Sequence, residues 1–256
     1  MSTVLYERKK GISYIRLNRP DKYNALNREM LVDLLDVVGQ AEKNDDQVVI
    51  LTGQGKAFSA GGDMAMLQEF SDKAYYDEVM ETIGTIIRKL YLMPKIVISA
   101  IHGSAAGLGL SLALTADYVV SGQESKMGMM FIGIGLAPDG GGHFWLRERM
   151  GTQRAKQFIW SKELVQGPEA QAMGLIDVLA EQDVMEEAGR IAEKVLVSPI
   201  QSMLQTKAIY HQSNLDTLNS YLDKERQAQW TLRNTDDHQE GVQAFIDKRK
   251  PVFKGK

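Results

Sequence analysis

The 256-residue sequence contains no cysteine, and this absence excludes several kinds of chemistry at once. Without thiols the chain forms no disulfide, has no thiolate nucleophile and offers no thiolate ligand to a metal. Its four histidines are scattered, with neither the His-x-His nor the Glu-x-x-His spacing that is typical of zinc sites: His102, His143, His211 and His238. The sequence therefore predicts no metal site.

Long apolar runs and an excess of basic charge are also lacking. No apolar run reaches the roughly 20 residues needed to cross a bilayer, and residues 1–10 lack the apolar segment of a secretory signal. The net charge of −3 and the pI of about 5.9 differ from the basic balance typical of nucleic-acid binders. We therefore expect a cytoplasmic protein that binds neither membranes nor nucleic acid. A phosphorylated ligand is compatible with this charge, because a few lysines or a helix N-terminus suffice to hold one.

What is present is an alternation of short strands and helices. Alternating and continuous apolar patterns predict strands at residues 4–8, 12–17, 48–52, 95–101 and 117–120, the first two forming a hairpin. Helical spacing predicts three helices in this part of the chain. The first runs from Asn24 or Asn27 to about Lys43, and the second from Asp63 to about Met93 with a break near Ser71. The third follows Gly109 and ends at Thr115. Past Pro168 mainly helices are predicted, over residues 169–173, 184–196, 200–211, 215–233 and 240–248. This order indicates an α/β fold with a mostly buried parallel sheet.

Two glycine-rich segments each join a predicted strand to a predicted helix. Residues 58–63 read Phe-Ser-Ala-Gly-Gly-Asp, and residues 103–109 read Gly-Ser-Ala-Ala-Gly-Leu-Gly. Backbone N–H groups are free at such helix starts, and glycine lets a ligand approach the backbone closely. Two loops of this kind side by side can aim two N–H groups at one oxygen, which is an oxyanion hole. From the residues alone, ordinary tight turns explain both segments equally well.

The third segment, residues 133–142, carries one carboxylate, Asp139, in a run of glycine and apolar residues. Methionine, phenylalanine and tryptophan side chains flank it on both sides. A carboxylate in such surroundings is costly to ionise, so its pKa should rise toward the working range of a general base. The alternative is a turn aspartate, or a cap for a helix that begins near Gly141.

In this order and spacing, the three segments are similar to those of the crotonase (enoyl-CoA hydratase/isomerase) superfamily. Further matching pieces extend the resemblance over essentially the whole chain: residues 17–20 (Leu-Asn-Arg-Pro), 24–26 (Asn-Ala-Leu), 57–63, 95–117, 240–245 and 248–253. The resemblance implies an α/β crotonase (ClpP-like) spiral of ββα units. It implies a catalytic core over residues 1–197 and a C-terminal helical oligomerisation region over residues 198–256, in a homotrimer or homohexamer.

The resemblance also implies the ligand and the residues around it. The ligand is an acyl-CoA thioester, and no separate cofactor is expected because coenzyme A is part of the substrate. The thioester carbonyl lies between the N–H groups of Gly62 and Leu108. Coenzyme A is expected near Lys22 and Ala60, with Lys250 and Phe253 of the basic tail often acting from a neighbouring subunit. The predicted acyl-binding residues are Ala60, Asp63, Met64, Met66, Met130, Phe131 and Trp145.

The reaction depends on which acidic side chains are present. Hydratases of this superfamily carry two glutamates, and the matching positions here are Ser111 and Phe131. Neither side chain can activate water, so hydration is disfavoured. Asp139, in a Pro-Asp-Gly-Gly setting, resembles the acid of the Δ3,Δ2-enoyl-CoA isomerases. The sequence therefore predicts an isomerase that shifts a double bond through an enolate, with Asp139 as acid/base.

Other reactions of the superfamily stay open to different degrees. The epoxide-to-oxepin isomerases of phenylacetate catabolism share the Asp139 setting. The dehalogenases pair such an aspartate with a histidine, and none lies between Asp63 and Ile101. A non-catalytic acyl-CoA binder would keep the glycine loops and use Asp139 only as a helix cap.

Overall fold

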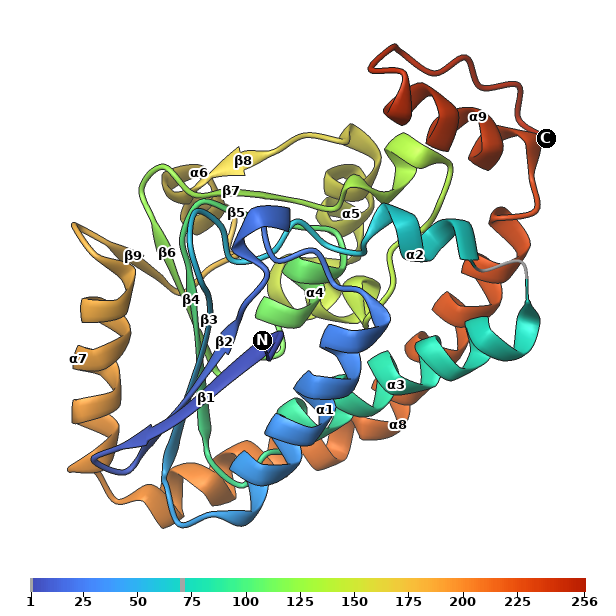
Figure 1. The fold of residues 1–256 in the computed structure, drawn as a ribbon. Coiled ribbons are helices and arrows are strands. Elements are labelled where there is room, and N and C mark those ends of the chain that lie inside the picture. The colour runs from blue at the N-terminus through green and yellow to red at the C-terminus, as the bar shows by residue number, and fades with distance from the viewer. Residues whose placement is uncertain (1, 70–71) are drawn as a thin grey trace.

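A computed structural model describes residues 2–69 and 72–256 (Figure 1). Its larger sheet has six strands in the order β1-β2-β3-β4-β6-β9: β1 Val4–Lys9, β2 Ile12–Leu17, β3 Val48–Gly53, β4 Ile96–Ile101, β6 Tyr118–Gly122 and β9 Val178–Ala180. Strands β1 and β2 form the predicted antiparallel hairpin, and every other neighbouring pair in this sheet is parallel. A smaller sheet has the order β5-β7-β8: β5 Ser104–Ala106, β7 Lys126–Gly128 and β8 Val165–Gln166.

Helices cover both faces of the larger sheet. They are η1 Pro20–Lys22, α1 Arg28–Lys43, α2 Met64–Glu69, α3 Lys73–Tyr91, α4 Leu108–Ala113, η2 Met130–Ile134, α5 Gly142–Ser161, α6 Gly167–Ala172, α7 Val184–Leu196, α8 Ile200–Leu232 and α9 Asp236–Ile246. Figure 1 shows α7 on one side of the sheet and α1, α3 and α4 on the other. The helix break predicted near Ser71 lies outside the described residues.

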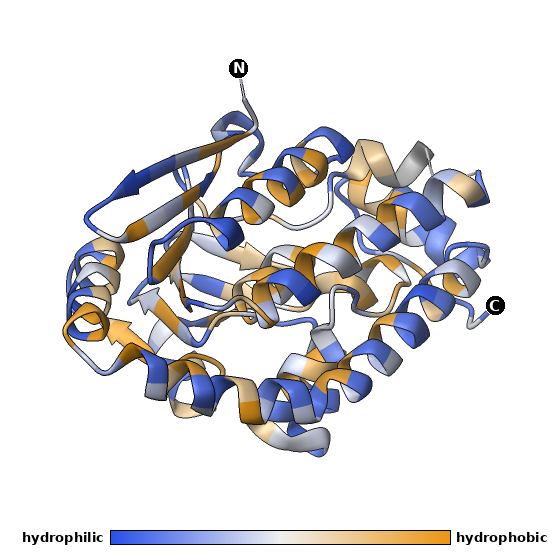
Figure 2. Ribbon diagram, turned by 90° about the horizontal axis from the view of Figure 1, so that it is seen from below, coloured by the Kyte–Doolittle hydropathy of each residue, from blue (hydrophilic) through white to orange (hydrophobic). Residues whose placement is uncertain are grey.

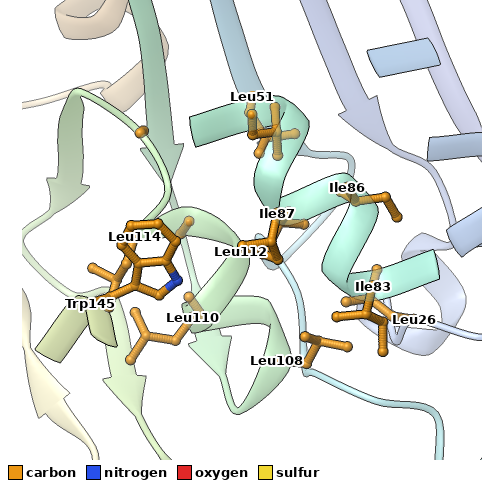
Figure 3. Packing of buried hydrophobic residues seen from close by; sticks show 14 of the residues in the cluster. Leu26, Leu51, Ile83, Ile86, Ile87, Leu108, Leu110, Leu112, Leu114 and Trp145 are labelled. Atoms are coloured by element: carbon orange, nitrogen blue, oxygen red, sulfur yellow. The ribbon is translucent and has the colours of Figure 1, made fainter. Parts of the chain in front are cut away.

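The parallel strands are buried on both faces, as their continuous apolar runs predict. In β3, Val49 and Leu51 point into the larger core cluster, which contains residues of α1, α3, α4 and α5. Val48 and Ile50 point into the second cluster, toward α7. Figure 3 shows Leu51 and the α3 isoleucines packed in the larger cluster, and Figure 2 shows polar residues along the outer helix faces. The predicted α/β layering with a buried parallel sheet is therefore confirmed.

In the C-terminal half, the structure adds the strand β9, begins α9 at Asp236 rather than at residue 240, and differs most from the prediction at α8. Residues 200–211 and 215–233 were expected to form two helices, but α8 runs without interruption from Ile200 to Leu232. In the structure the Ser213 hydroxyl donates to the carbonyl of Ile209, which lets a serine stay inside a helix. One consequence is that the far half of α8 reaches α3 and α5 and joins the larger core through Leu218 and Leu222.

Candidate active site

The first two glycine-rich segments lie side by side. Ser59 forms a parallel β-bridge with Ala105; its N–H donates to the Ser104 carbonyl at 3.0 Å, and its carbonyl accepts the Ala106 N–H at 3.0 Å. At Gly61, which has a φ of +95°, a Cβ would lie 2.7 Å from the Ala106 oxygen and 3.5 Å from the Leu108 nitrogen. Only glycine permits this close approach of the two loops.

The approach brings two backbone amides to the same place. The Leu26 N–H donates to the Gly61 carbonyl and the Asp63 N–H donates to the Leu26 carbonyl. These two hydrogen bonds form a parallel β-bridge between Leu26 and Gly62, and the Gly62 N–H takes no part in it. Leu108 is the first residue of α4, where an amide has no acceptor within the helix. Among the described residues, neither the Gly62 nor the Leu108 N–H has a hydrogen-bond acceptor. The arrangement suits one ligand oxygen.

Asp139 lies on a loop that packs against α4. At Gly140, with a φ of +63°, a Cβ would come within 2.6 Å of the Leu108 side chain and 3.1 Å of Ser111 Cβ. Part of Asp139 remains exposed, but its Oδ1 is fully buried and has no hydrogen-bond partner in residues 2–69 and 72–256. Its Oδ2 accepts one hydrogen bond from Gln229 at 3.2 Å. Burial, and then the negative charge of Glu225, raise the pKa of Asp139 to about 8.

Helix α8 supplies two polar residues to this loop, and the sequence analysis missed both. Glu225, with 2% of its side chain exposed, accepts the N–H groups of Gly141 at 2.7 Å and His143 at 3.0 Å, and also contacts His143 Nδ1 at 2.8 Å. It thereby satisfies amides at the start of α5, which has no side-chain cap of its own. A signal was available in the spacing. Leu218, Leu222, Glu225 and Gln229 follow helical periodicity, so two polar side chains fall on the buried stripe of α8.

Neither position that matched a hydratase glutamate holds an acid. Ser111 is fully buried, and its hydroxyl donates to the Asp139 backbone carbonyl at 2.7 Å. Phe131, in η2, lies beside Gly107, the residue that precedes α4. A Cβ atom at Gly107 would lie 3.5 Å from the Phe131 ring. Ser111 therefore supports the Asp139 loop, and Phe131 forms an apolar wall beside the Leu108 amide.

The other predicted binding residues fall into groups. The Ala60 N–H donates to the Tyr23 carbonyl at 2.9 Å, so Ala60 lies next to η1, which carries the exposed Lys22. The Asp63 carboxylate pairs with Arg19 at 2.8 Å and accepts the Ala65 N–H at 3.0 Å, so both oxygens have structural partners.

The predicted acyl-chain residues are spread over three elements. Met64 is partly exposed on α2, Met66 is buried on the same helix, and Met130 begins η2. Trp145 is buried in the core (Figure 3), and its indole N–H donates to the Gly140 carbonyl at 3.0 Å. The structure thus places Trp145 beneath the Asp139 loop, as a support for it.

The basic tail is held against α9. The N–H groups of Lys254 and Gly255 donate to the Asp237 carboxylate at 2.6 and 2.8 Å, and the Asp237 N–H donates to the Lys256 carbonyl. Figure 1 shows this tail at the end of the molecule away from β1 and β2.

Over residues 2–69 and 72–256, no three histidine, aspartate or glutamate side chains gather closely enough to hold a metal ion. Within the same residues, no helix combines the length and the apolar character that a bilayer crossing needs.

Known proteins are similar to this chain over its full length. The model of the enoyl-CoA hydratase/isomerase family matches residues 7–256. The chain is 45% identical over 253 residues to YhaR of Bacillus subtilis, named as an enoyl-CoA hydratase/isomerase, with 99% of each chain covered. It is 30% identical to the trans-2-decenoyl-[acyl-carrier-protein] isomerase of Streptococcus mutans, covering 99% of this chain and 98% of that protein. It is 32% identical to the 1,2-epoxyphenylacetyl-CoA isomerase of Escherichia coli, with 100% of each covered.

A solved structure agrees with the fold. The crystal structure of an enoyl-CoA hydratase from Mycobacterium avium subsp. paratuberculosis superposes with a TM-score of 0.89 at 27% identity, covering 98% of both chains. The spiral α/β fold predicted from the sequence is therefore confirmed. Hydratase and isomerase names both occur among these relatives, so the choice of reaction depends on the side chains around Asp139.

Proposed function

The chain belongs to the enoyl-CoA hydratase/isomerase family, and from that premise we propose that it is an enoyl-CoA isomerase in which Asp139 moves a proton between C2 and C4 of a 3-enoyl thioester. The observation that carries the proposal is the Asp139 carboxyl group. One of its oxygens is buried without a partner among the described residues, its pKa is raised to about 8, and it lies on the loop that packs against Leu108. Both positions that would carry a second acid hold Ser111 and Phe131 instead.

The mechanism begins at the two amides. The N–H groups of Gly62 and Leu108 bind the thioester oxygen and stabilise the negative charge that develops on it, an effect worth about 10²–10³ in rate per donor. This makes the C2 proton more acidic. The ionised Asp139 removes that proton, and the negative charge spreads from the thioester oxygen to C4. Asp139 then returns the proton to C4, which leaves the double bond between C2 and C3.

Hydration makes a demand that this site does not meet. A water molecule must be activated by one group while another group delivers a proton to the substrate. The Ser111 hydroxyl already donates to the Asp139 carbonyl, and the Phe131 ring has no exchangeable proton. A proton shift on one face of the substrate needs only one acid/base group, so Asp139 alone suffices for isomerisation.

A second candidate is the opening of a ring epoxide to an oxepin thioester. The similarity to the 1,2-epoxyphenylacetyl-CoA isomerase of Escherichia coli favours it, and a single acid beside an oxyanion hole serves that chemistry too. The Streptococcus mutans relative widens the choice of carrier, because its name gives an acyl-carrier-protein substrate. The same proposal includes a homotrimer or homohexamer, in which Lys250 and Phe253 reach the coenzyme A bound by a neighbouring subunit.

The test is turnover of trans-3-hexenoyl-CoA to the conjugated 2-enoyl thioester, with crotonyl-CoA hydration measured in parallel. We expect the wild type to isomerise and to hydrate negligibly. Replacing the acid/base group in Asp139→Asn should slow isomerisation by about 10²–10⁴-fold. Asp216→Asn, at an exposed position of α8, is the matched control and should leave the rate unchanged.

Other outcomes redirect the proposal. Efficient hydration of crotonyl-CoA would show that the roles assigned to Ser111 and Phe131 are wrong. Conversion of an epoxyphenylacetyl thioester without isomerisation of the hexenoyl substrate would favour the second candidate. Tight thioester binding without any turnover, unaffected by Asp139→Asn, would identify a non-catalytic binder.

A further inference from the structure

We propose that Gln229 is a positioning residue that anchors one oxygen of the Asp139 carboxyl group, so that the other oxygen, Oδ1, both takes the proton from C2 and returns it to C4. This inference rests on the proposed isomerase function and deepens it. It assigns a role to Gln229 on the buried side of α8, which lies 90 residues from Asp139 in the sequence.

The contacts of Gln229 define the anchor. The residue is 4% exposed, and its Nε2 donates to the Ala137 carbonyl at 2.7 Å and to Asp139 Oδ2 at 3.2 Å. The carbonyl oxygen of Ala137 accepts hydrogen bonds only, so the NH₂ end of the amide must face it, which fixes the orientation of the side chain. Since Ala137 and Asp139 flank Pro138, one amide group holds the loop and the carboxyl group together.

This anchor decides which oxygen carries the transferred proton. A proton on Oδ2 would point at an N–H donor, which is repulsive, whereas Oδ1 has no hydrogen-bond partner among the described residues. The protonated form of Asp139 therefore has its proton on Oδ1. In the ionised form Oδ1 is also the oxygen without a competing donor, so it is the better base.

Both proton transfers then use the same oxygen, Oδ1. The C2–H bond breaks, the proton moves to Oδ1, and the electron pair spreads over the thioester oxygen, C2 and C4. A C4–H bond next forms with the proton from Oδ1, and the remaining pair closes the bond between C2 and C3. Oδ1 has no accessible surface, so the acyl chain must move its neighbours aside to reach it. While the acyl chain covers Oδ1, the proton should return to the same substrate molecule faster than it exchanges with water.

Two titratable residues face this carboxyl group from other elements. Glu225, on α8, disfavours ionisation of Asp139 by its charge. Tyr76, on α3, donates its hydroxyl to the Arg226 carbonyl at 2.5 Å, and burial raises its own pKa, so it stays neutral. Gln229 acts in the opposite sense to Glu225, because a donated N–H favours the ionised carboxylate. Losing Gln229 should therefore move the pH profile upward.

The experiment uses trans-3-hexenoyl-CoA carrying deuterium at C2, with Gln229→Met and the matched control Gln227→Met. Methionine keeps the length of glutamine and removes the donors, and Gln227 is exposed on the same helix. For wild type and control we expect much of the deuterium at C4 of the product. For Gln229→Met we expect a kcat lower by roughly 10- to 100-fold, a KM that changes little, and deuterium lost to water.

A second substitution keeps the test decisive if Gln229→Met does not fold. Gln229→Glu preserves shape but puts a negative charge against Asp139, so its pH profile should move to higher pH than that of Gln227→Glu. An unchanged kcat and unchanged deuterium transfer in Gln229→Met, or equal pH profiles for the two glutamate variants, would overturn the inference. Failure of the proposed function looks different, because then the wild type does not isomerise or Asp139→Asn remains active.

Discussion

Asp117 lies against the first half of α8 and Asp139 against the second half. The two carboxyl groups differ in the charged groups that surround them. Near the first half, Asp117 Oδ2 accepts the ammonium of Lys207 at 2.7 Å and the Val97 N–H at 2.8 Å. Lys207 is 9% exposed and also donates to the Lys95 carbonyl. Near the second half, Asp139 has one donor, Gln229, and a neighbouring negative charge, Glu225.

The comparison separates a structural aspartate from a candidate catalytic one. At Asp117 a cation and an amide both donate to the carboxylate, so the pair with Lys207 joins α8 to the end of β4. Within residues 2–69 and 72–256 no cationic group pairs with Asp139 and its Oδ1 has no hydrogen-bond partner, and the pKa of Asp139 rises to about 8. Such an arrangement costs stability, and it is typical of a group kept for a reaction. The same substitution at the two sites should therefore act in opposite directions.

The largest effect is expected at the paired aspartate. Asp117→Asn leaves the buried Lys207 without its counter-ion, which typically costs about 3–5 kcal/mol of unfolding free energy. Urea denaturation at pH 7 measures this, with Asp216→Asn as the exposed control. Activity per folded molecule should be unchanged. A loss below about 1 kcal/mol would mean that the pair behaves like an exposed one, and the comparison would fail.

At the unpaired aspartate the change should have the opposite sign. The pKa of Asp139 is about 8 in the folded chain, well above its ordinary value of 3.8. Between these values the folded protein keeps a proton that the unfolded chain has lost, so folding stability falls as pH rises. An asparagine does not titrate, so Asp139→Asn should equal the wild type near pH 4 and be more stable by about 1–3 kcal/mol at pH 9. A variant less stable than wild type at pH 9 would contradict this.

A smaller effect sharpens the electrostatic part of the comparison. Glu225→Gln removes the negative charge beside Asp139. The Gly141 and His143 amides donate to different oxygens of Glu225, so glutamine keeps an acceptor for one of the two. The pKa of Asp139 should fall, so the rising limb of kcat/KM against pH should move to lower pH. The exposed Glu193→Gln on α7 is the control. A shift to higher pH would show that loop geometry, and not charge, controls Asp139.

The smallest effect is expected at Ser111. Ser111→Ala loses the hydrogen bond to the Asp139 carbonyl, worth about 0.5–1.5 kcal/mol, and should leave isomerisation within about threefold, a difference below 1 kcal/mol. Ser99→Ala is a matched control, because the buried Ser99 hydroxyl has no partner among the described residues and its loss should be neutral or stabilising. A loss of activity as large as that of Asp139→Asn would make Ser111 part of the chemistry.

Much of this arrangement could be predicted from the sequence. Alternation and turn residues gave the β1–β2 hairpin, continuous apolar runs gave the buried strands, and the glycine segments gave the two loops that meet at Gly61. The apolar run around Asp139 correctly predicted that its pKa would be raised. These features depend on neighbours in the chain, so local patterns describe them.

The remainder depends on contacts between distant segments. Glu225 and Gln229 belong to a helix that the sequence appeared to divide near Ser213, and only the continuous α8 brings them to the Asp139 loop. The helical spacing predicts that Glu225 and Gln229 fall on the apolar stripe of α8, but it does not predict which groups they contact. Asp63 likewise reads as a ligand-binding residue, while its ion pair with Arg19 depends on a loop 44 residues away.

The pH dependence of kcat/KM for trans-3-hexenoyl-CoA isomerisation tests the central claim most directly, because this ratio reports ionisations of the free enzyme. The account predicts a rise with pH through a single ionisation that levels off above about 8, the pKa of Asp139. The rise should be absent from the residual activity of Asp139→Asn. A profile that is flat from pH 6 to 9, or that falls over this range, would contradict the assignment of Asp139 as the base.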